Sequence, residues 1–213
     1  MLQTEGRNYK LAKNQYEGYQ YIDLDNLYTY KNSTVLINKQ NILDPNSAKN
    51  NEHLHVSKRL ADLYIQPILV YSTEDIQKIH KYLFQDVYSW AGQYRKVNIS
   101  KSGNPFMSIQ SFNSAEEYLN DLLNTYHQKA NTKECIIRSL AKILDSLNFF
   151  HPFREGNGRT QREVIRVLAI SKGYRAQIRV SDNDIIYNTY MDGTVYGDLQ
   201  KLENLFELIL EKI

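Results

Sequence analysis

The stretch NFFHPFREGNGRTQREVIR, residues 148–166, joins two segments of helical periodicity through one short loop. Pro152 cannot continue the helix before it, because proline lacks an amide proton. Gly156 and Gly158 then allow the backbone to bend sharply or a ligand to come close. We therefore predict a tight loop between two packed helices, the second of which begins near Asn157 or Gly158.

The apolar pattern over the rest of the chain predicts an all-α fold with one small β-hairpin. The expected helices cover about 52–65, 72–84, 114–128, 131–147, 157–172, a short segment capped by Ser181 with Asp184, and a last one from about Asp198 with apolar positions as far as Ile213. Ser72 is expected to cap the second of these helices, and Asn131 with Glu134 to form a capping box for the fourth. His80 lies on an apolar stripe, which favours a satisfied core histidine over a ligand or base.

The segment YRKVNISKSGNPFMSIQSF, residues 94–112, carries the only persuasive β-signal. Val97 and Ile99 alternate with polar residues before the turn sequence GNP, and Phe106 and Ile109 follow it. Alternation on both sides of a glycine-bearing turn is typical of a hairpin.

The whole chain, residues 1–213, is predicted to be one domain with a core over about 72–206. Residues 1–51 show little helical periodicity and include six tyrosines between Tyr9 and Tyr30, so we expect an extended or irregular arm. These rings could pack on a neighbouring surface or stack on single-stranded nucleic acid. Lys and Arg are sparse there, which disfavours direct nucleic-acid binding.

Composition excludes several classes of protein. Lys and Arg number 26 and Asp and Glu number 24, so a net charge of +2 does not indicate a polyanion binder. No basic-then-apolar leader or bilayer-length apolar stretch is found in the sequence, which favours a cytoplasmic protein, although translocation on another signal stays open. The single cysteine, Cys135, is expected to be packed and inert.

The loop before the second helix has the composition of an anion site. The first amides of a helix have no partner inside it, so a helix beginning at Asn157 points donors into the loop. Arg159, Arg162 and Arg166 follow at spacings of three and four residues, where guanidinium groups can hold phosphate oxygens. The alternative is a solvated arginine face in which Glu163 pairs with a neighbour.

Two further residues of the loop carry chemistry of their own. Glu155 is a hard oxygen ligand next to the anion site, which suits Mg²⁺ shared with a nucleotide. His151 stands at the mouth of the loop, and histidine is a natural general base near neutral pH. No Ser or Cys nucleophile accompanies it in the motif, which argues against acyl transfer. Phe153 is expected to anchor the loop by burial.

The sequence HPFREGNGRTQR, residues 151–162, resembles the signature of Fic-domain proteins, His-x-Phe-x-(Asp or Glu)-Gly-Asn-Gly-Arg-x-x-Arg, at every defining position. IHKYLFQDVYSWAGQYR, residues 79–95, is similar to the segment that precedes the hairpin in these proteins. VLINKQNILDP, residues 35–45, resembles an N-terminal element of the stand-alone bacterial type. The resemblance implies a mainly helical protein that transfers AMP from ATP to a hydroxyl of a protein side chain.

The resemblance also implies roles for the residues of the motif. His151 would deprotonate a Tyr, Ser or Thr hydroxyl of the target, and Glu155 would hold Mg²⁺ against the α- and β-phosphates of ATP. The substrate and the metal ion implied are thus ATP and Mg²⁺.

Five residues would bind the phosphates in this comparison. Gly156, Asn157 and Gly158 would form an anion hole with their backbone amides and the Asn157 side chain. Arg159 would stabilise the β-phosphate region, and Arg162 would grip the γ-phosphate. Members with alanine and lysine in place of the two glycines transfer the terminal phosphate instead, so the glycines of this chain favour AMP transfer.

In the family the hairpin is a flap that docks the target's backbone by strand addition. Here the docking positions would be Ile99, Lys101, Pro105, Phe106 and Ile109; a plain surface hairpin is the alternative.

Two tyrosines following the strand-like sequence YRAQIRV could border the adenine of ATP. They are Tyr187 and Tyr190, for which core packing is the alternative.

Regulation and target are implied only by the resemblance. Many family members block the γ-phosphate pocket with a helix bearing Ser or Thr, three residues, then Glu-Gly or Glu-Asn, and no such sequence occurs in this chain. A toxin inhibited in trans by a small antitoxin is therefore expected. Type II topoisomerases such as gyrase are one expected target class, and host GTPases are another if the protein is a secreted effector. Another donor, such as phosphocholine, and a non-enzymatic binding module remain as alternatives.

Overall fold

The computed structural model describes residues 20–21, 27–101, 103–178 and 185–213. Within these ranges the chain forms seven α-helices: α1 (Pro45–Ile65), α2 (Thr73–Phe84), α3 (Phe112–Lys129), α4 (Lys133–Phe150), α5 (Asn157–Ser171), α6 (Ile185–Tyr196) and α7 (Leu199–Ile209). The remaining elements are β1 (Gln20–Tyr21), β2 (Ile99–Lys101), β3 (Asn104–Pro105), the 3-10 helix η1 (Ile109–Ser111), β4 (Tyr174–Arg175) and β5 (Glu211–Lys212). The predicted all-α class with a small hairpin is confirmed.

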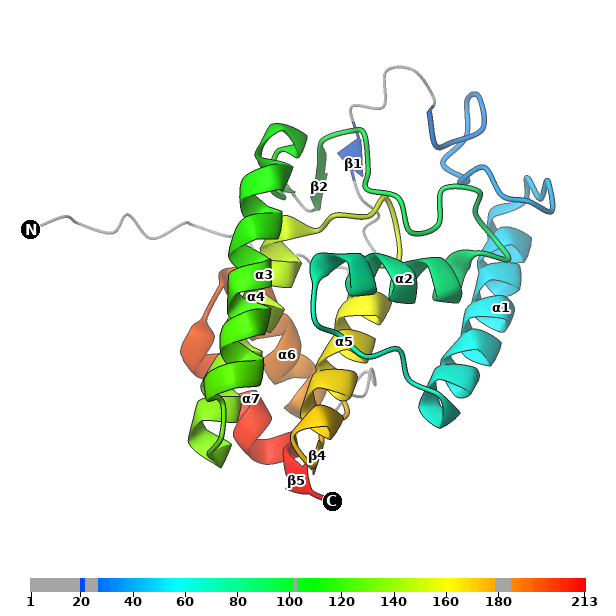
Figure 1. Cartoon of the computed structure of the whole chain (residues 1–213). Helices are drawn as coiled ribbons and strands as arrows, with labels where there is room; N and C mark the ends of the chain where they lie inside the picture. Colours follow the sequence, from blue (N-terminus) through cyan, green and yellow to red (C-terminus); the bar gives the residue numbers. More distant parts are fainter. Residues whose placement is uncertain (1–19, 22–26, 102, 179–184) are drawn as a thin grey trace, which may run out of the picture.

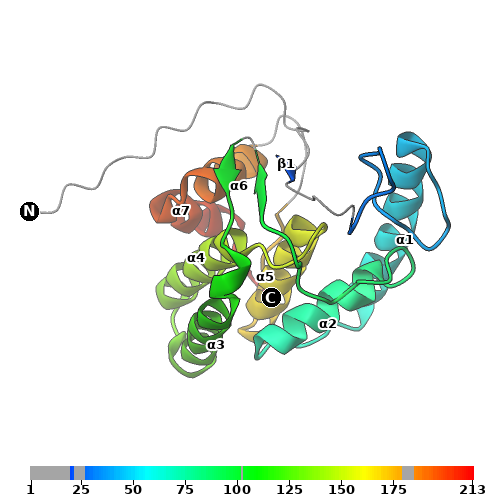
Figure 2. The same ribbon diagram turned by 90° about the horizontal axis from the view of Figure 1, so that it is seen from above.

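The helices pack around α4 and α5 (Figure 1). Helix α4 contacts α3, α5, α6 and α7, while α2 crosses the N-terminal part of α5 and in turn contacts α1. Seen from above, α1 and α2 stand apart from the α3, α4, α6 and α7 group, with α5 between the two groups (Figure 2). The apolar faces meet in one buried cluster that includes Ile79, Leu144 and Val164. The loop between α4 and α5 is thereby held at the centre of the molecule.

Helix α1 begins at Pro45, seven residues before the expected start. Asp44 caps it by accepting a hydrogen bond from the Ser47 amide (2.8 Å), and Pro45 stands in the first turn, where its missing amide proton costs nothing. Residues 45–51 were expected to belong to an extended or irregular arm. This expectation was wrong, because Asp44-Pro45 begins a helix.

The starts of α2 and α4 agree in part with the starts expected from the sequence. The Asp75 carboxylate accepts from the Ser72 amide (3.1 Å), which completes a capping box at the expected start of α2. Helix α4 is capped by Thr132 rather than Asn131. Cys135 lies in its first turn, outside the apolar stripe, and is exposed; the expectation of a packed thiol was wrong.

The C-terminal helix is shorter than predicted. Helix α7 starts after its N-cap, Asp198, as expected, but it ends at Ile209. The chain continues as β5, which pairs with β4 through Tyr174↔Lys212 and Arg175↔Glu211. Backbone pairing thus replaces the last expected helical turn. The predicted cap of Ser181 with Asp184 lies outside the described residues.

The hairpin is confirmed but is shorter than its sequence pattern. Strands β2 and β3 pair through Ser100↔Pro105 and Lys101↔Asn104, and β1 adds to the other edge of β2. Ile109 lies in η1 and not in a strand, so its expected place in the flap was wrong. The chain leaves the sheet after Phe106 because the Met107 amide donates to the Phe149 carbonyl (3.0 Å) at the end of α4. No helix in the described part of the chain is long and apolar enough to cross a membrane.

Candidate active site

His151 ends helix α4 in a left-handed backbone conformation (φ 45°, ψ 57°). Its amide still donates to the Leu147 carbonyl (3.0 Å), so the residue turns the chain directly after the last helical bond. The residue is 5% exposed, and Nδ1 lies 3.1 Å from the Asn148 carbonyl. Since a carbonyl only accepts, Nδ1 carries the proton, and Nε2 carries the lone pair of the neutral imidazole.

Burial lowers the pKa of His151 to about 3. The hydrogen bond to Asn148 opposes this shift, and the positive charges of Arg95 and Lys101 reinforce it. A histidine in this environment is neutral throughout the physiological range. It can therefore accept a proton without first having to lose one.

We expect the kcat/KM of any reaction that uses His151 as a base to show no acid limb near pH 6.5. A lowered pKa leaves the ring unprotonated between its folded value of about 3 and the ordinary value of 6.5. Initial rates from about pH 8 to about pH 5 measure this, because kcat/KM reports the pKa values of the free enzyme. Circular dichroism at each pH separates loss of fold from loss of rate. A rate that halves close to pH 6.5 would contradict the assignment.

The loop after His151 is closed by the Asn157 side chain. Its amide oxygen accepts from the Phe153 amide (2.9 Å), and its amide nitrogen donates to the Phe153 carbonyl (2.8 Å). Asn157 is 1% exposed. The predicted contact between this side chain and an anion stays a prediction, and it would have to use the second N–H of the amide, because each polar atom already has a partner within the loop. The buried Phe153 ring stacks on the His80 ring, with ring centroids 3.8 Å apart, and anchors the loop as expected.

His80 supports the loop from α2. The Gly92 amide donates to Nδ1 (2.8 Å), so Nε2 carries the proton and donates to the Glu155 carbonyl (3.0 Å). The prediction of a satisfied core histidine is confirmed. The hydrogen bond nevertheless ties α2 to the backbone of Glu155.

Helix α5 begins where the loop presents its donors. Gly156 is the N-cap (φ 83°), and the first amides of the helix, starting with that of Asn157, have no acceptor within it. A β-carbon on Gly158 would lie 3.3 Å from Arg162 Nη1 and 3.9 Å from the Tyr190 hydroxyl. The helix start, the Arg162 guanidinium and the Tyr190 hydroxyl thus face the same small volume, which has the dipole and the charge to hold phosphate oxygens.

The Gly156 amide is the exception among the expected donors. It donates to the carboxylate of Glu155 (2.9 Å), the residue directly before it. An anion would have to share or displace this contact.

Arg159 is enclosed by two carboxylates. Its guanidinium lies 2.6 Å from Glu52 and 3.5 Å from Glu155, above the ring of Phe84. The Tyr88 hydroxyl donates to the other oxygen of Glu52. Sequence reasoning missed Glu52, because no spacing relates a residue of α1 to one of α5. The β-phosphate role of Arg159 stays a prediction, and it requires the guanidinium to serve an anion besides these partners.

Glu155 is the one motif carboxylate at the site. Burial raises its pKa, the nearby Arg159 opposes the shift, and the negative charge of Glu52 adds to it. A cation beside this carboxylate would relieve the cost of its charge. The described residues hold no group of three or more His, Cys, Asp or Glu arranged for a metal ion. One carboxylate beside a phosphate site fits Mg²⁺, which takes most of its ligands from phosphate and water.

Arg166 does not belong to the anion site. It pairs with Glu163 (2.7 Å) and donates to the Leu63 carbonyl (2.9 Å), with 7% of the residue exposed. The expectation that it would join Arg159 and Arg162 was wrong, and the alternative of pairing with Glu163 is confirmed. One turn of helix carries Arg166 past the loop and into the interface with α1.

The rings of Tyr187 and Tyr190 are both part of the buried core, at 9% and 5% exposure. Core packing, the alternative named for them, is thus observed. The hydroxyl of Tyr190 lies beside Gly158, 3.9 Å from the position that a β-carbon on this glycine would take. A role of either residue at an adenine stays a prediction.

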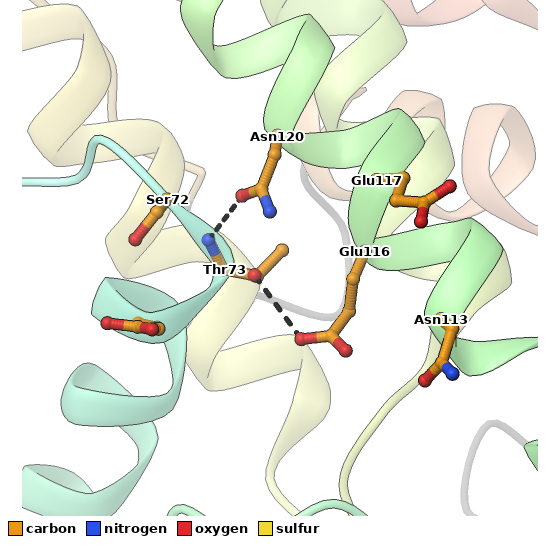
Figure 3. Close-up of a pocket in the computed structure, with 7 residues that line it drawn as sticks. Ser72, Thr73, Asn113, Glu116, Glu117 and Asn120 are labelled. Atoms are coloured by element: carbon orange, nitrogen blue, oxygen red, sulfur yellow. Dashed lines mark hydrogen bonds between the residues drawn. The ribbon is translucent and has the colours of Figure 1, made fainter.

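A separate hollow of about 530 Å³ lies between the start of α2 and α3 (Figure 3). Thr73 spans it by donating from its amide to Asn120 (2.8 Å) and from its hydroxyl to Glu116 (3.4 Å). Glu74 and Glu117 also line it. This acidic lining would repel phosphate, and it contains no residue of the loop.

Known proteins are similar to this chain over the segment that contains the loop. Residues 70–169 match the model of the Fic/DOC family. The chain is 26% identical to "Probable protein adenylyltransferase Fic" of Escherichia coli K12, over 87% of this chain and 92% of that protein. It is 32% identical to a probable protein adenylyltransferase of Sinorhizobium fredii, over 68% of this chain and 76% of the other.

Solved structures share the fold. The effector BepC of Bartonella tribocorum with bound AMPPNP superposes with a TM-score of 0.77 and 23% identity, covering 90% of this chain and 99% of the other. At this identity the likeness concerns the fold, and the nucleotide belongs to BepC.

Proposed function

The chain belongs to the Fic/DOC family, and from that premise we propose that it is a protein adenylyltransferase. It would transfer AMP from ATP to a Tyr, Ser or Thr hydroxyl of a target protein. One observation carries the proposal: a neutral, buried His151 with its lone pair on Nε2 stands six residues before Asn157, where α5 begins. A proton acceptor and an anion site therefore meet in one loop.

In the proposed reaction the target hydroxyl attacks the α-phosphorus of ATP. His151 Nε2 takes the hydroxyl proton, a bond forms between the target oxygen and the α-phosphorus, and the bond from that phosphorus to the bridging oxygen breaks. Pyrophosphate leaves with the electrons of that bond. The protein supplies alignment and charge rather than a covalent intermediate.

The chain's own residues would hold the triphosphate along the start of α5. The amides of Asn157 and Gly158 and the guanidinium of Arg162 supply donors, and Glu155 would hold Mg²⁺ against the phosphates. Bound there, the ion would neutralise phosphate charge as the leaving group departs. The shape of the loop depends on Gly156, where only a residue without a side chain leaves room for Phe84.

We expect a lysate incubated with the protein and Mg²⁺ to incorporate label from α-³²P-ATP and not from γ-³²P-ATP. The outcome separates AMP transfer from transfer of the terminal phosphate, because pyrophosphate carries the γ label away. Label from the γ position alone would refute the proposal. The absence of label from both would favour another donor, such as phosphocholine, or a binding module.

Inhibition in trans by a small antitoxin is the regulatory part of the proposal. Arg162 has no carboxylate partner among the described residues, and the sequence has no inhibitory motif of the expected form. A partner's glutamate could therefore occupy the place of the γ-phosphate. The wild-type protein purified alone should then label its target without any activating substitution. Mass spectrometry of the labelled band identifies that target, with type II topoisomerases as the first candidates.

A further inference from the structure

Arg95 is a buried cation between the flap and the loop that carries the base. It follows α2 by eleven residues and precedes β2 by four, and it is 2% exposed. Its guanidinium lies over the ring of Phe112 (4.9 Å), which fills the space on one side and leaves the donors to point along the guanidinium plane.

The donors of Arg95 reach three different backbone segments. Nε donates to the His151 carbonyl (2.9 Å), and Nη1 donates to the Val97 carbonyl (2.6 Å), just before β2. Nη2 donates to the Met107 carbonyl, just after β3. A planar group with five donors in a rigid fork can satisfy all three, whereas an ammonium on a flexible stem cannot reproduce this geometry.

The backbone of Arg95 adds a fourth contact in the same place. Its amide donates to the Pro152 carbonyl (2.8 Å). Two successive carbonyls, those of His151 and Pro152, are therefore held by one residue. This matters because a non-glycine residue in the left-handed region, as His151 is, persists only where its surroundings enforce that conformation.

The flap also contacts His151 and the end of α4 directly. The Phe106 ring stacks on the His151 imidazole, with ring centroids 3.6 Å apart and planes 15° from parallel. The Met107 amide donates to the Phe149 carbonyl (3.0 Å). The strand that would register a target and the imidazole that would take its proton are thus joined through Arg95 and through direct contacts.

We propose that Arg95 is a positioning residue that sets the register between the flap and the catalytic base. It acts through the carbonyls of His151, Val97 and Met107. The inference rests on the proposed function, since it assigns the flap to the target and His151 to proton transfer. Without the guanidinium, the target hydroxyl and Nε2 no longer meet at a defined distance, although ATP still binds.

The test compares Arg95→Met and Arg95→Lys with the wild type in transfer kinetics. We expect kcat/KM for the target to fall about 10²-fold in both, the scale of a misplacement of about 1 Å. The affinity for Mg²⁺-ATP, measured by calorimetry, should stay at the wild-type value. Guanidinium ion, added below denaturing concentrations, should restore part of the transfer activity of a third variant, Arg95→Ala. It should leave the activity of the wild-type protein unchanged.

Arg59→Met is the matched control for loss of a structural arginine. Arg59 on α1 donates twice to Asp86 (2.7 and 3.0 Å), two residues after the end of α2, so its removal should lower stability without loss of transfer. An Arg95→Met protein that transfers at the wild-type rate, or that loses ATP binding together with transfer, overturns the inference. An equal loss of transfer activity in Arg59→Met would also overturn the inference. If Arg95→Met fails to fold, Arg95→Lys decides the question in the same way.

Hydrogen exchange tests the coupling independently of any reaction. In Arg95→Lys, amides of residues 97–101, 103–107 and 148–152 should exchange faster together, while the start of α5 keeps its wild-type protection. Faster exchange in only one of the two segments would refute the coupling. A wild-type protein that transfers no AMP would refute the proposed function, but this measurement would still decide the role of Arg95.

Discussion

His151→Ala is expected to lower the rate of AMP transfer by about 10²–10⁴-fold, the usual contribution of a positioned general base. The residue is neutral, its Nδ1 proton is held by the Asn148 carbonyl, and no other described histidine belongs to the loop. The measurement is the initial rate of α-³²P incorporation into the purified target. Binding of Mg²⁺-ATP should persist, because the proposed phosphate donors lie on α5.

Alanine at position 151 also disturbs the backbone, so a second variant is needed. Asparagine tolerates the left-handed region far better than alanine, and it has no basic nitrogen. His151→Asn should therefore keep more of the stability of the wild type and lose the same activity. Replacement of His53, which is exposed on α1, should change neither the stability nor the transfer activity. Transfer at the wild-type rate by His151→Asn would show that another group accepts the proton.

Gly156→Ala is expected to lower the free energy of unfolding by about 2–5 kcal/mol, the sum of overpacking and of a left-handed backbone. A β-carbon at this position would lie 2.2 Å from Phe84 Cζ, and φ is 83°. Because the N-cap of α5 moves with any relief of this clash, ATP binding should weaken as well. Urea unfolding and calorimetry measure the two effects.

Gly173→Ala provides the matched control. Gly173 has nearly the same backbone angle (φ 77°), but no atom lies within 4 Å of the position of its β-carbon. Gly173→Ala should therefore lower the free energy of unfolding by only about 1–2 kcal/mol, the contribution of the left-handed conformation. Phe84→Leu combined with Gly156→Ala should recover part of the stability, since neighbouring changes are not additive. Equal losses in the two glycine variants would mean that the contact with Phe84 is unimportant.

Much of the site could be predicted from local sequence. Pro152 and the glycines mark the turn, the start of α5 follows at Asn157 as expected, and Ser72 caps α2. These features depend on residues within one helical turn of each other. The start of α1 was missed although its signal is local, because Asp-Pro is shared by turns and helix starts, and only packing against α2 distinguishes them here.

The sequence by itself determined which groups stand in the loop: the imidazole of His151, the carboxylate of Glu155 and the two glycines at the start of α5, all within twelve residues. Only the tertiary structure decided how these groups are held. Glu52 meets Arg159 across 107 residues, and Arg95 meets the His151 carbonyl across 56. Periodicity describes which face of a helix is buried, but not which face of another helix it meets. Such contacts follow from the packing of whole elements, and no spacing in the chain encodes them.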